Sequence, residues 1–199
     1  PTNVKKGNNP DEQKEFDEAM SRINVILEGL YITRDTNFPD DEALISRAAI
    51  SSIEVVGCTL DPGGYLMLNG NRSPIKNSID LKIPFGFADP NEESAFNQVP
   101  TVTLERTISG PIFIDKDYQV LKLINCIIDA GSGVHADPML AESAFAISGS
   151  SSDPSTSWSA PVNIFGATFF GRMRSKKVQD VCMGGIWVHT LEILDNQTG

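Results

Sequence analysis

The chain has 199 residues, of which 40% are hydrophobic and 21% charged, and its formal net charge is −10 at pH 7. This length and composition suit one domain with one sizeable core. The acidic balance argues against nucleic acid as a partner, because the phosphate backbone is bound by clustered Lys and Arg. We expect no membrane insertion, since no apolar run reaches the roughly 18 to 20 residues that a bilayer requires. The polar residues 1–9 do not form a secretory signal, so the localisation stays unknown.

Residues 9–21 carry a helix pattern. Asn9 can cap the first turn, Pro10 suits its first position, and an apolar stripe begins at Phe16. We interpret residues 1–22 as a linker and a capping helix that covers the open end of the following domain, because an exposed end strand needs a cover. The alternatives are a docking helix for a partner and a linker from a preceding domain.

One short pattern recurs along the rest of the chain: apolar, any, apolar, two turn-like residues, small or apolar, any, apolar. The apolar residues alternate as in a strand with one buried face, and the alternation restarts in phase after a two-residue corner. Successive copies begin about 20 to 28 residues apart, or near twice that where a copy is missing, which is a solenoid period. The six copies are Val25-Leu27-Leu30-Ile32, Ile53-Val55-Cys58-Leu60, Val102-Leu104-Thr107-Ser109, Leu121-Leu123-Cys126-Ile128, Val162-Ile164-Ala167-Phe169 and Ile186-Val188-Leu191-Ile193.

The corner of each copy indicates a bend rather than a hairpin. A bend keeps both apolar halves on one wall, whereas a hairpin would reverse the chain. Glycine and asparagine tolerate the left-handed backbone that such a corner needs, and they occupy four of the six positions. The second corner residue is Gly29, Gly57, Arg106, Asn125, Gly166 and Thr190 in turn. The sequence therefore predicts an all-β fold, a right-handed parallel β-helix, over residues 23–199.

Other segments connect the copies. Tyr65–Leu68 and Ile79–Ile83 have strand patterns and are interpreted as strands of a coil whose corner is lost. Residues 85–100, rich in acid, Pro and Asn, are expected to project from the body. The Ser-rich residues 149–160 are of low complexity and are expected to be mobile. The basic run at 172–177 is interpreted as a solvated turn between coils, with a specific anion site as the alternative.

The three cysteines have no paired short spacing, so the sequence predicts neither a disulfide framework nor a metal site. Cys58 and Cys126 occupy the same place in the repeat, with at least one coil between them. Because neighbouring strands lie about 4.8 Å apart, we expect these two residues near 10 Å or more from each other, too far to bridge. We interpret them as small buried hydrophobes. No cofactor is expected.

A β-helix that degrades acidic polysaccharides would need carboxylates around calcium with a basic residue, or a cluster of Asp. The corner pair Glu105–Arg106 is not repeated in the other copies, so no stacked wall of acids and bases is predicted. Asp129, His135 and Asp137 form the best grouping, because a histidine can act near neutral pH. They are weak catalytic candidates, and the alternative is a surface histidine beside turn-forming aspartates.

Two aromatic residues are candidates for stacking on a sugar. Trp158 lies in the Ser-rich segment, and Tyr65 follows the turn at residues 61–64. The alternative for Trp158 is that its ring folds back onto the coil.

Several segments resemble the β-helix region of large, poorly characterised bacterial proteins. Residues 125–130 (NCIIDA), 146–148 (AIS) and 161–172 (PVNIFGATFFGR) resemble a run of that family that reads DSI-D-A, AI and PALTLE-STVFGRV. Residues 53–63 (IEVVGCTLDPG) are similar to its LEHCTLVPG, and residues 108–112 (ISGPI) to its SILGPI. The likeness covers Ile23 to Gly199 and departs at Phe165-Gly166 and at residues 85–100.

Proteins of that family include phage-tail-like proteins and proteins encoded near contractile injection genes. The resemblance implies a β-helix but brings no catalytic residues. Because the sequence opens on Pro1 and stops at Gly199 directly after a strand pattern, we expect a piece of a longer protein.

The leading hypothesis for function is a non-enzymatic structural or recognition module. Its expected partners are other domains of the same longer protein, together with polysaccharide or particle components. The alternatives are a carbohydrate-active enzyme, either a polysaccharide lyase or a hydrolase, and a sugar-binding module.

Overall fold

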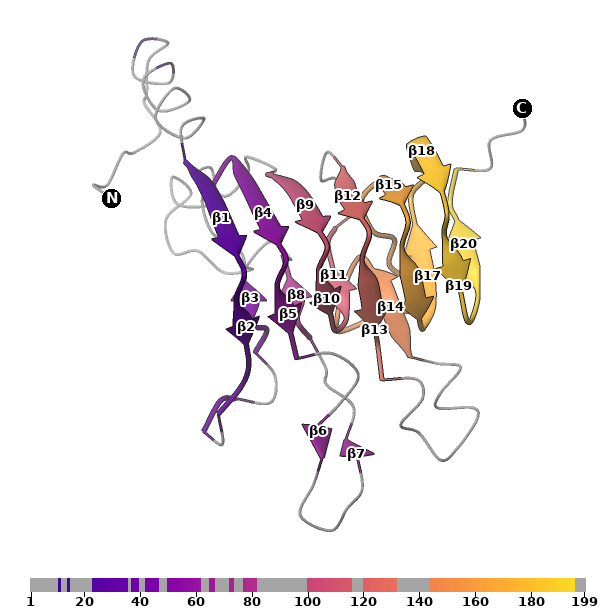
Figure 1. Cartoon of the computed structure of the whole chain (residues 1–199). Coiled ribbons are helices and arrows are strands. Elements are labelled where there is room, and N and C mark those ends of the chain that lie inside the picture. The colour runs from indigo at the N-terminus through magenta and orange to yellow at the C-terminus, as the bar shows by residue number, and fades with distance from the viewer. Residues whose placement is uncertain are drawn as a thin grey trace.

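The computed structural model describes residues 23–35, 37–39, 42–46, 50–61, 65–66, 72–73, 77–81, 100–115, 120–131 and 144–195, together with Asp11 and Lys14. The chain winds as a right-handed parallel β-helix, which confirms the predicted fold class (Figure 1). The helix predicted over 9–21 is not confirmed, because all but two of its residues lie outside the described part. Of the predicted excursion at 85–100, all residues but Pro100 also lie outside it.

Six coils stack along one axis, and each coil gives one strand to each of three parallel sheets, here named A, B and C. Sheet A contains β1 (Asn24–Glu28), β4 (Ser52–Val56), β9 (Thr101–Glu105), β12 (Leu121–Ile124), β15 (Val162–Phe165) and β18 (Val178–Met183). Sheet B contains β2 (Tyr31–Ile32), β5 (Thr59–Leu60), β10 (Ile108–Ser109), β13 (Ile127–Asp129), β16 (Thr168–Phe170) and β19 (Ile186–Trp187). Sheet C contains β3 (Ile45–Ser46), β8 (Ile79–Asp80), β11 (Ile112–Phe113), β14 (Phe145–Ser148), β17 (Arg172–Ser175) and β20 (Leu191–Ile193).

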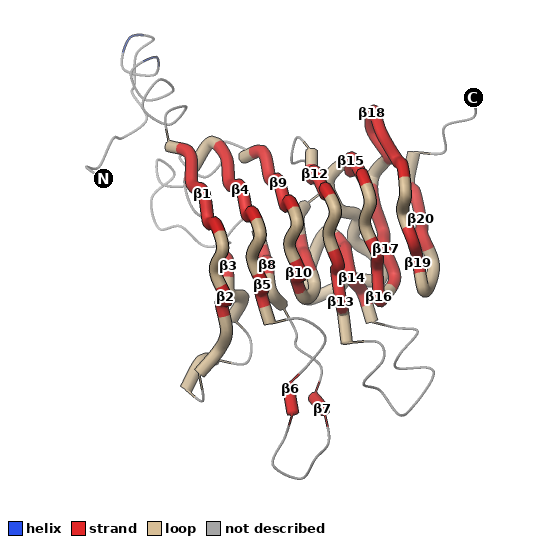
Figure 2. The backbone as a smooth tube through the Cα atoms, viewed as in Figure 1, coloured by secondary structure: helices blue, strands red, loops and turns tan. Residues whose placement is uncertain are grey.

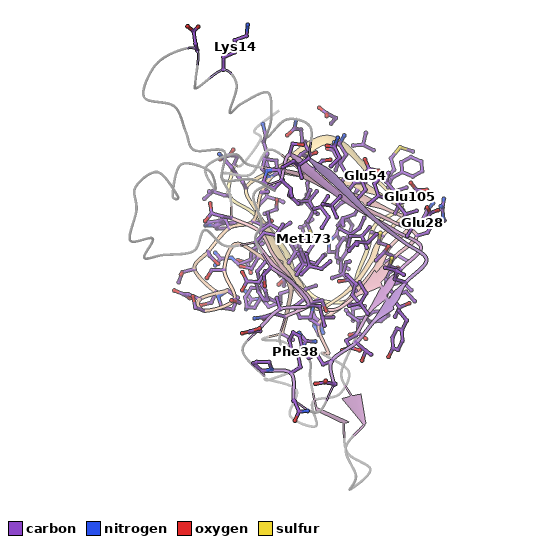
Figure 3. All side chains as sticks on the ribbon, turned by 90° about the vertical axis from the view of Figure 1, so that its left-hand side faces the viewer. Lys14, Glu28, Phe38, Glu54, Glu105 and Met173 are labelled. Carbon is purple, nitrogen blue, oxygen red and sulfur yellow. The ribbon has the colours of Figure 1, made fainter. Side chains whose placement is uncertain are left out.

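Like side chains stack in columns inside the solenoid, because the strands of neighbouring coils pair in register. One column of sheet A consists of Leu27, Val55, Leu104, Leu123, Ile164 and Cys182. One column of sheet C consists of Ile45, Ile79, Ile112, Ile147, Met173 and Leu191. In Figure 3 Met173 lies inside the ring of strands, whereas Glu28, Glu54 and Glu105 point outward. Burying each large apolar side chain contributes about 1.5 to 3 kcal/mol, so these columns are the main stabilising element.

The corner between sheets A and B has a left-handed residue in every coil. The φ angles are 65° at Gly29, 60° at Gly57, 48° at Arg106, 53° at Asn125, 71° at Gly166 and 64° at Gly184. Five of these six positions are those predicted from the repeat. The bend between the short strands is visible along the whole body in Figure 2.

The prediction for the sixth copy was wrong. Residues 186–193 span β19 and β20 and therefore belong to sheets B and C, and the sixth corner is Met183-Gly184 rather than His189-Thr190. The strand before that corner, β18, does not show the repeat pattern in its sequence, because its register against β15 shifts. Val162 pairs with Val178, but Ile164 pairs with Cys182, so two extra residues interrupt the alternation.

The interpretation of residues 65–68 as part of a coil was also wrong. Tyr65–Leu66 is β6, which pairs antiparallel with β7 (Arg72–Ser73) in a hairpin between β5 and β8. Among the described strands, β8 completes the second coil, and β6 and β7 form a separate two-stranded sheet outside the three stacked sheets.

A column of small hydrogen-bonding residues follows the corner. Cys58 and Cys126 are both 2% exposed, and Thr107 of the intervening coil is 1% exposed. The Thr107 hydroxyl lies 3.0 Å from the carbonyl oxygen of Val55 in the preceding coil, and Cys126 Sγ lies 3.3 Å from that of Leu104. Burial raises the pKa of the Cys126 thiol. The expected place of both cysteines, with a coil between them, is confirmed.

Candidate functional site

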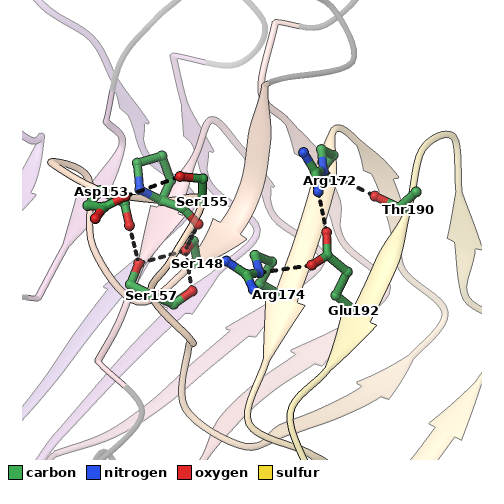
Figure 4. Close-up of polar contacts among 9 residues, drawn as sticks. Ser148, Asp153, Ser155, Ser157, Arg172, Arg174, Thr190 and Glu192 are labelled. Atoms are coloured by element: carbon green, nitrogen blue, oxygen red, sulfur yellow. Dashed lines mark hydrogen bonds and ion pairs between the residues drawn. The ribbon is translucent and has the colours of Figure 1, made fainter.

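The outer face of sheet C is covered by the Ser-rich segment, for which the sequence predicts mobility. In the structure this segment is tied to the strands by hydrogen bonds (Figure 4). Ser148 is fully buried, and its hydroxyl donates toward the carbonyl oxygens of Pro154 and Ser157, at 2.8 and 3.0 Å. The Ser159 amide donates to the carbonyl of Arg174 at 3.0 Å. The segment therefore forms an outer layer on the coil.

Hydroxyl groups also organise the tip of this segment. Thr156 Oγ1 donates to Asp153 Oδ2 at 2.5 Å, and Ser155 Oγ lies 3.2 Å from Asp153 Oδ1. These hydrogen bonds, and the positive charge of Arg174, lower the pKa of Asp153. The serine composition thus serves a local network in which hydroxyls satisfy a carboxylate.

The basic run at 172–177 is not a solvated turn, as was predicted for it. Arg172–Ser175 is the strand β17, and only Lys176 and Lys177 connect it to β18. Met173 faces the core, so Arg172 and Arg174 lie on the outer face, where both form ion pairs with Glu192 of β20 (Figure 4). Arg174 Nε lies 3.0 Å from Glu192 Oε2.

Aromatic rings cover both arginines. The Trp158 ring lies 4.0 Å from the guanidinium of Arg174, and the Phe145 ring lies 4.9 Å from that of Arg172. The Arg174 side chain is only 11% exposed. Trp158 therefore folds back onto the coil, the alternative raised for it, and one face of its ring is occupied by a guanidinium.

The remaining predicted site residues are not gathered into one site by the described part of the chain. Asp129 ends β13, and its Oδ1 accepts a hydrogen bond from the Gly131 amide at 2.8 Å, which is the contact of a turn-forming aspartate. His135 and Asp137 lie outside the described residues. The Tyr65 backbone belongs to the hairpin, but its side chain is outside the described part.

The described residues contain no group of three or more His, Cys, Asp or Glu side chains that could hold a metal ion. The corner residues Glu105 and Arg106 form an ion pair with each other on the surface. An exposed pair of this kind contributes little to stability and provides no third group for proton transfer.

Several large apolar side chains of coils 5 and 6 are exposed. On the outside of sheets A and B, Phe165 is 51% exposed and Met183 is 59% exposed, and the two residues are paired in register. We call this surface of coils 5 and 6 the apolar corner. Its exposed residues are Phe165, Phe170, Met183, Ile186 and Val188. A contiguous exposed apolar patch often marks a contact site for another molecule.

The sequence did not reveal the apolar corner, because the repeat highlights the inward residues. Phe165 stands at the corner position that is Val56, Glu105 and Ile124 in the preceding coils, so its exposure follows from the register. Met183 and Ile186 could not be placed until the true sixth corner was known. Aligning β18 correctly with β15 in the sequence would have predicted this surface.

Fold and surface together define a β-helix with one covered sheet and one exposed apolar corner. Comparison with known protein families, with curated proteins and with solved structures gives no match to this chain. No helix in the described part is long and apolar enough to span a membrane.

Proposed function

We propose that this β-helix is a non-enzymatic structural or recognition module of a larger bacterial protein, of the phage-tail-like kind that the sequence resemblance implies. The observation that carries the proposal is the apolar corner, in which the neighbouring Phe165 and Met183 are both more than half exposed. The parallel sheets beneath hold these side chains on a rigid, hydrogen-bonded support, which suits a docking surface. The expected partners are other domains of the same protein or components of a particle.

The covered outer face of sheet C supports a structural role for its charged residues. Arg172, Arg174 and Glu192 are engaged with one another, and the arginines also with aromatic rings. Ion pairs that are packed beneath aromatic rings in this way stabilise the outer layer.

Photo-cross-linking from two positions of sheet A tests the proposal. A photoreactive phenylalanine analogue at position 165 should cross-link to another domain or particle component in cells that make the protein. The same label at position 122, an exposed lysine on the outer face of that sheet, is the matched control and should give far less product. Equal cross-linking from both positions would contradict the proposal.

A turnover screen tests the enzymatic alternatives. The purified protein is incubated with acidic and neutral polysaccharides, with and without calcium, and the reducing ends or unsaturated products are measured. No turnover is expected. Turnover that is lost in Asp129→Asn or His135→Ala would replace the proposed function with a lyase or hydrolase.

A further inference from the structure

The outer face of sheet B has a central row of uncharged side chains. The strands pair in register, so one residue of each coil lies beside its equivalent in the next coil. This row consists of Tyr31, Thr59, Ile108, Ile127, Thr168 and Ile186. The middle outward row of sheet A, in contrast, contains Glu54 and Lys122. A row of β-branched and aromatic residues suits packing against another sheet, and it is uncharged on a protein whose formal net charge is −10.

Large apolar side chains of this face are exposed in the middle of the solenoid. Ile108 of coil 3 is 37% exposed and Ile127 of coil 4 is 38% exposed. In coil 5, Phe165 stands at the edge toward sheet A and is 51% exposed, and Phe170 stands at the edge toward sheet C and is 38% exposed. Each of these coils has a described coil on either side, so the exposure belongs to the outer face and not to an end of the solenoid.

The area of this face matches that of a stable protein contact. The apolar corner, together with Ile108 and Ile127, comprises seven apolar side chains that are 37% to 59% exposed. A large side chain covers roughly 150 to 250 Å², so these residues, with Tyr31 and the two threonines of the row, offer on the order of 800 Å². Each partner buries about that area in a standard-size interface.

A second copy of this chain presents a matching surface. When two sheets pack face to face, their strands stay nearly aligned. A two-fold axis parallel to the solenoid axis places each coil opposite the same coil of the second copy and exchanges the two edges of sheet B. Phe165 then lies opposite Phe170 of the second copy, and Met183 lies opposite Val188. Ile127 meets its own equivalent in the centre, so apolar groups face apolar groups.

Charged residues favour this orientation over the reversed one. A two-fold axis parallel to the strands would place coil 1 opposite coil 6 and coil 3 opposite coil 4. Met183 would then face Glu28, and Ile124 would face Glu105. A carboxylate buried against an apolar side chain is costly when it has no partner.

The favoured orientation leaves one carboxylate near an apolar side chain. Asp129 of coil 4 lies opposite Ile124 of the second copy, at the rim of the contact. Its Oδ1 already accepts a hydrogen bond from the Gly131 amide at 2.8 Å. The exposed apolar residues of coils 5 and 6 therefore contact one another, and the carboxylate beside them keeps a partner.

We propose that the outer face of sheet B docks the same face of a second copy, in a two-fold dimer whose solenoid axes run side by side in the same direction. This inference rests on the proposed function and names the partner of the apolar corner. Because both molecules use the same surface, the contact is complete with two copies.

Phe165→Glu and Phe170→Asp test the contact, and both should fold because the repeat already has carboxylates at these positions. Glu105 is the equivalent of Phe165 in coil 3, and Asp129 is the equivalent of Phe170 in coil 4. Sedimentation velocity over a concentration series should give dimers for the unchanged protein. Each variant should raise the dissociation constant roughly a hundredfold, because the new charge enters the contact twice at about tenfold each. Thr103→Glu, on the outer face of sheet A, adds the same charge and should leave the dimer intact.

A pair of cysteines determines the orientation. Phe165→Cys and Phe170→Cys are made in separate molecules, in a Cys182→Ser background that removes the exposed native thiol. A short bis-maleimide reagent should cross-link an equimolar mixture, because the two positions face each other across the two-fold axis. Either variant alone should give little product. Efficient product from either variant alone, a trimer, or an unchanged protein that stays monomeric would overturn the proposal.

The photoreactive label at position 165 separates this inference from the proposed function. Product between two copies of the chain, lost when Phe170→Asp is added, supports the dimer. A purified protein that stays monomeric, while the label captures another domain or a particle component, overturns the second copy as partner. In that case the apolar corner remains the docking surface and the proposed function stands.

Discussion

Asn125 lies over Gly166, and its Oδ1 is 2.5 Å from the position that a Cβ on Gly166 would take. Both residues have a left-handed backbone at the same corner of neighbouring coils. Gly57 has a similar φ but no atom within 4 Å of its Cβ position. The two glycines therefore separate the cost of a left-handed backbone from the cost of a close contact.

Alanine at these two positions should have different effects. Gly57→Ala should lower the free energy of unfolding by about 1 to 2 kcal/mol, the cost of the left-handed backbone for a residue with a Cβ. Gly166→Ala should cost more, because the new methyl overlaps the Asn125 amide. Urea unfolding of both variants checks this. Gly166→Ala is also measured in an Asn125→Gly background, where its loss relative to Asn125→Gly alone should fall to that of Gly57→Ala because the amide is gone. Equal losses for both single variants would contradict the argument.

Thr107 lies between the two buried cysteines in the column, and its hydroxyl forms hydrogen bonds with backbone groups around it. Its oxygen lies 3.0 Å from the Val55 carbonyl oxygen and 3.4 Å from the Cys58 amide nitrogen, which can donate to it. Thr107→Val keeps the shape but leaves these buried groups unpaired, so it should cost about 1 to 3 kcal/mol of unfolding free energy. Thr107→Cys, which continues the thiol column, should cost less. Chemical denaturation compares them, and equal losses would mean that the hydroxyl contributes no hydrogen bond.

The sequence predicted most of the fold because the interior of a solenoid repeats. Val55, Leu104 and Leu123 differ little from one another and stack directly, so the alternation alone reveals five coils. The third strand of each coil was not predicted as part of the repeat. β11 and β14 lie at different distances from their corners, since the connections between sheets B and C vary in length.

Less of the candidate site could be predicted from the sequence, because the site consists of outward-facing residues whose positions depend on the strand register. Trp158 and Arg174 are 16 residues apart and meet only because the Ser-rich segment returns over β17. The run from Arg172 to Lys177 resembles a turn in composition, but Met173 occupies a core column and makes the first four residues a strand. Because the register of β18 shifts, the last coil and the exposed position of Met183 could not be predicted from the repeat.

Trp158 should stabilise the outer layer rather than bind sugar. Trp158→Ala removes the contact with Arg174, worth about 0.5 to 2 kcal/mol, and also the apolar area that the ring covers. Thermal unfolding should show the loss, and Trp158→Phe should restore part of it, since a smaller ring still covers the guanidinium. Any glycan that binds the protein on an array should bind Trp158→Ala equally well. Loss of glycan binding in Trp158→Ala, with normal folding, would favour the sugar-binding alternative.

The tip of the Ser-rich segment should loosen in acid, because hydrogen bonds from Thr156 and Ser155 hold the pKa of Asp153 below its usual range. A lowered pKa in the folded state means that the carboxylate form favours the closed segment. This contribution is fully present above the ordinary value and is lost as the pH falls through the lowered one. Fluorescence of Trp158, measured in a Trp187→Phe background that leaves a single tryptophan, should change below about pH 4. Asp153→Asn should remove this change, whereas Glu54→Gln, on the exposed face of sheet A, should retain it. An acid transition that survives in Asp153→Asn would show that another group controls the segment.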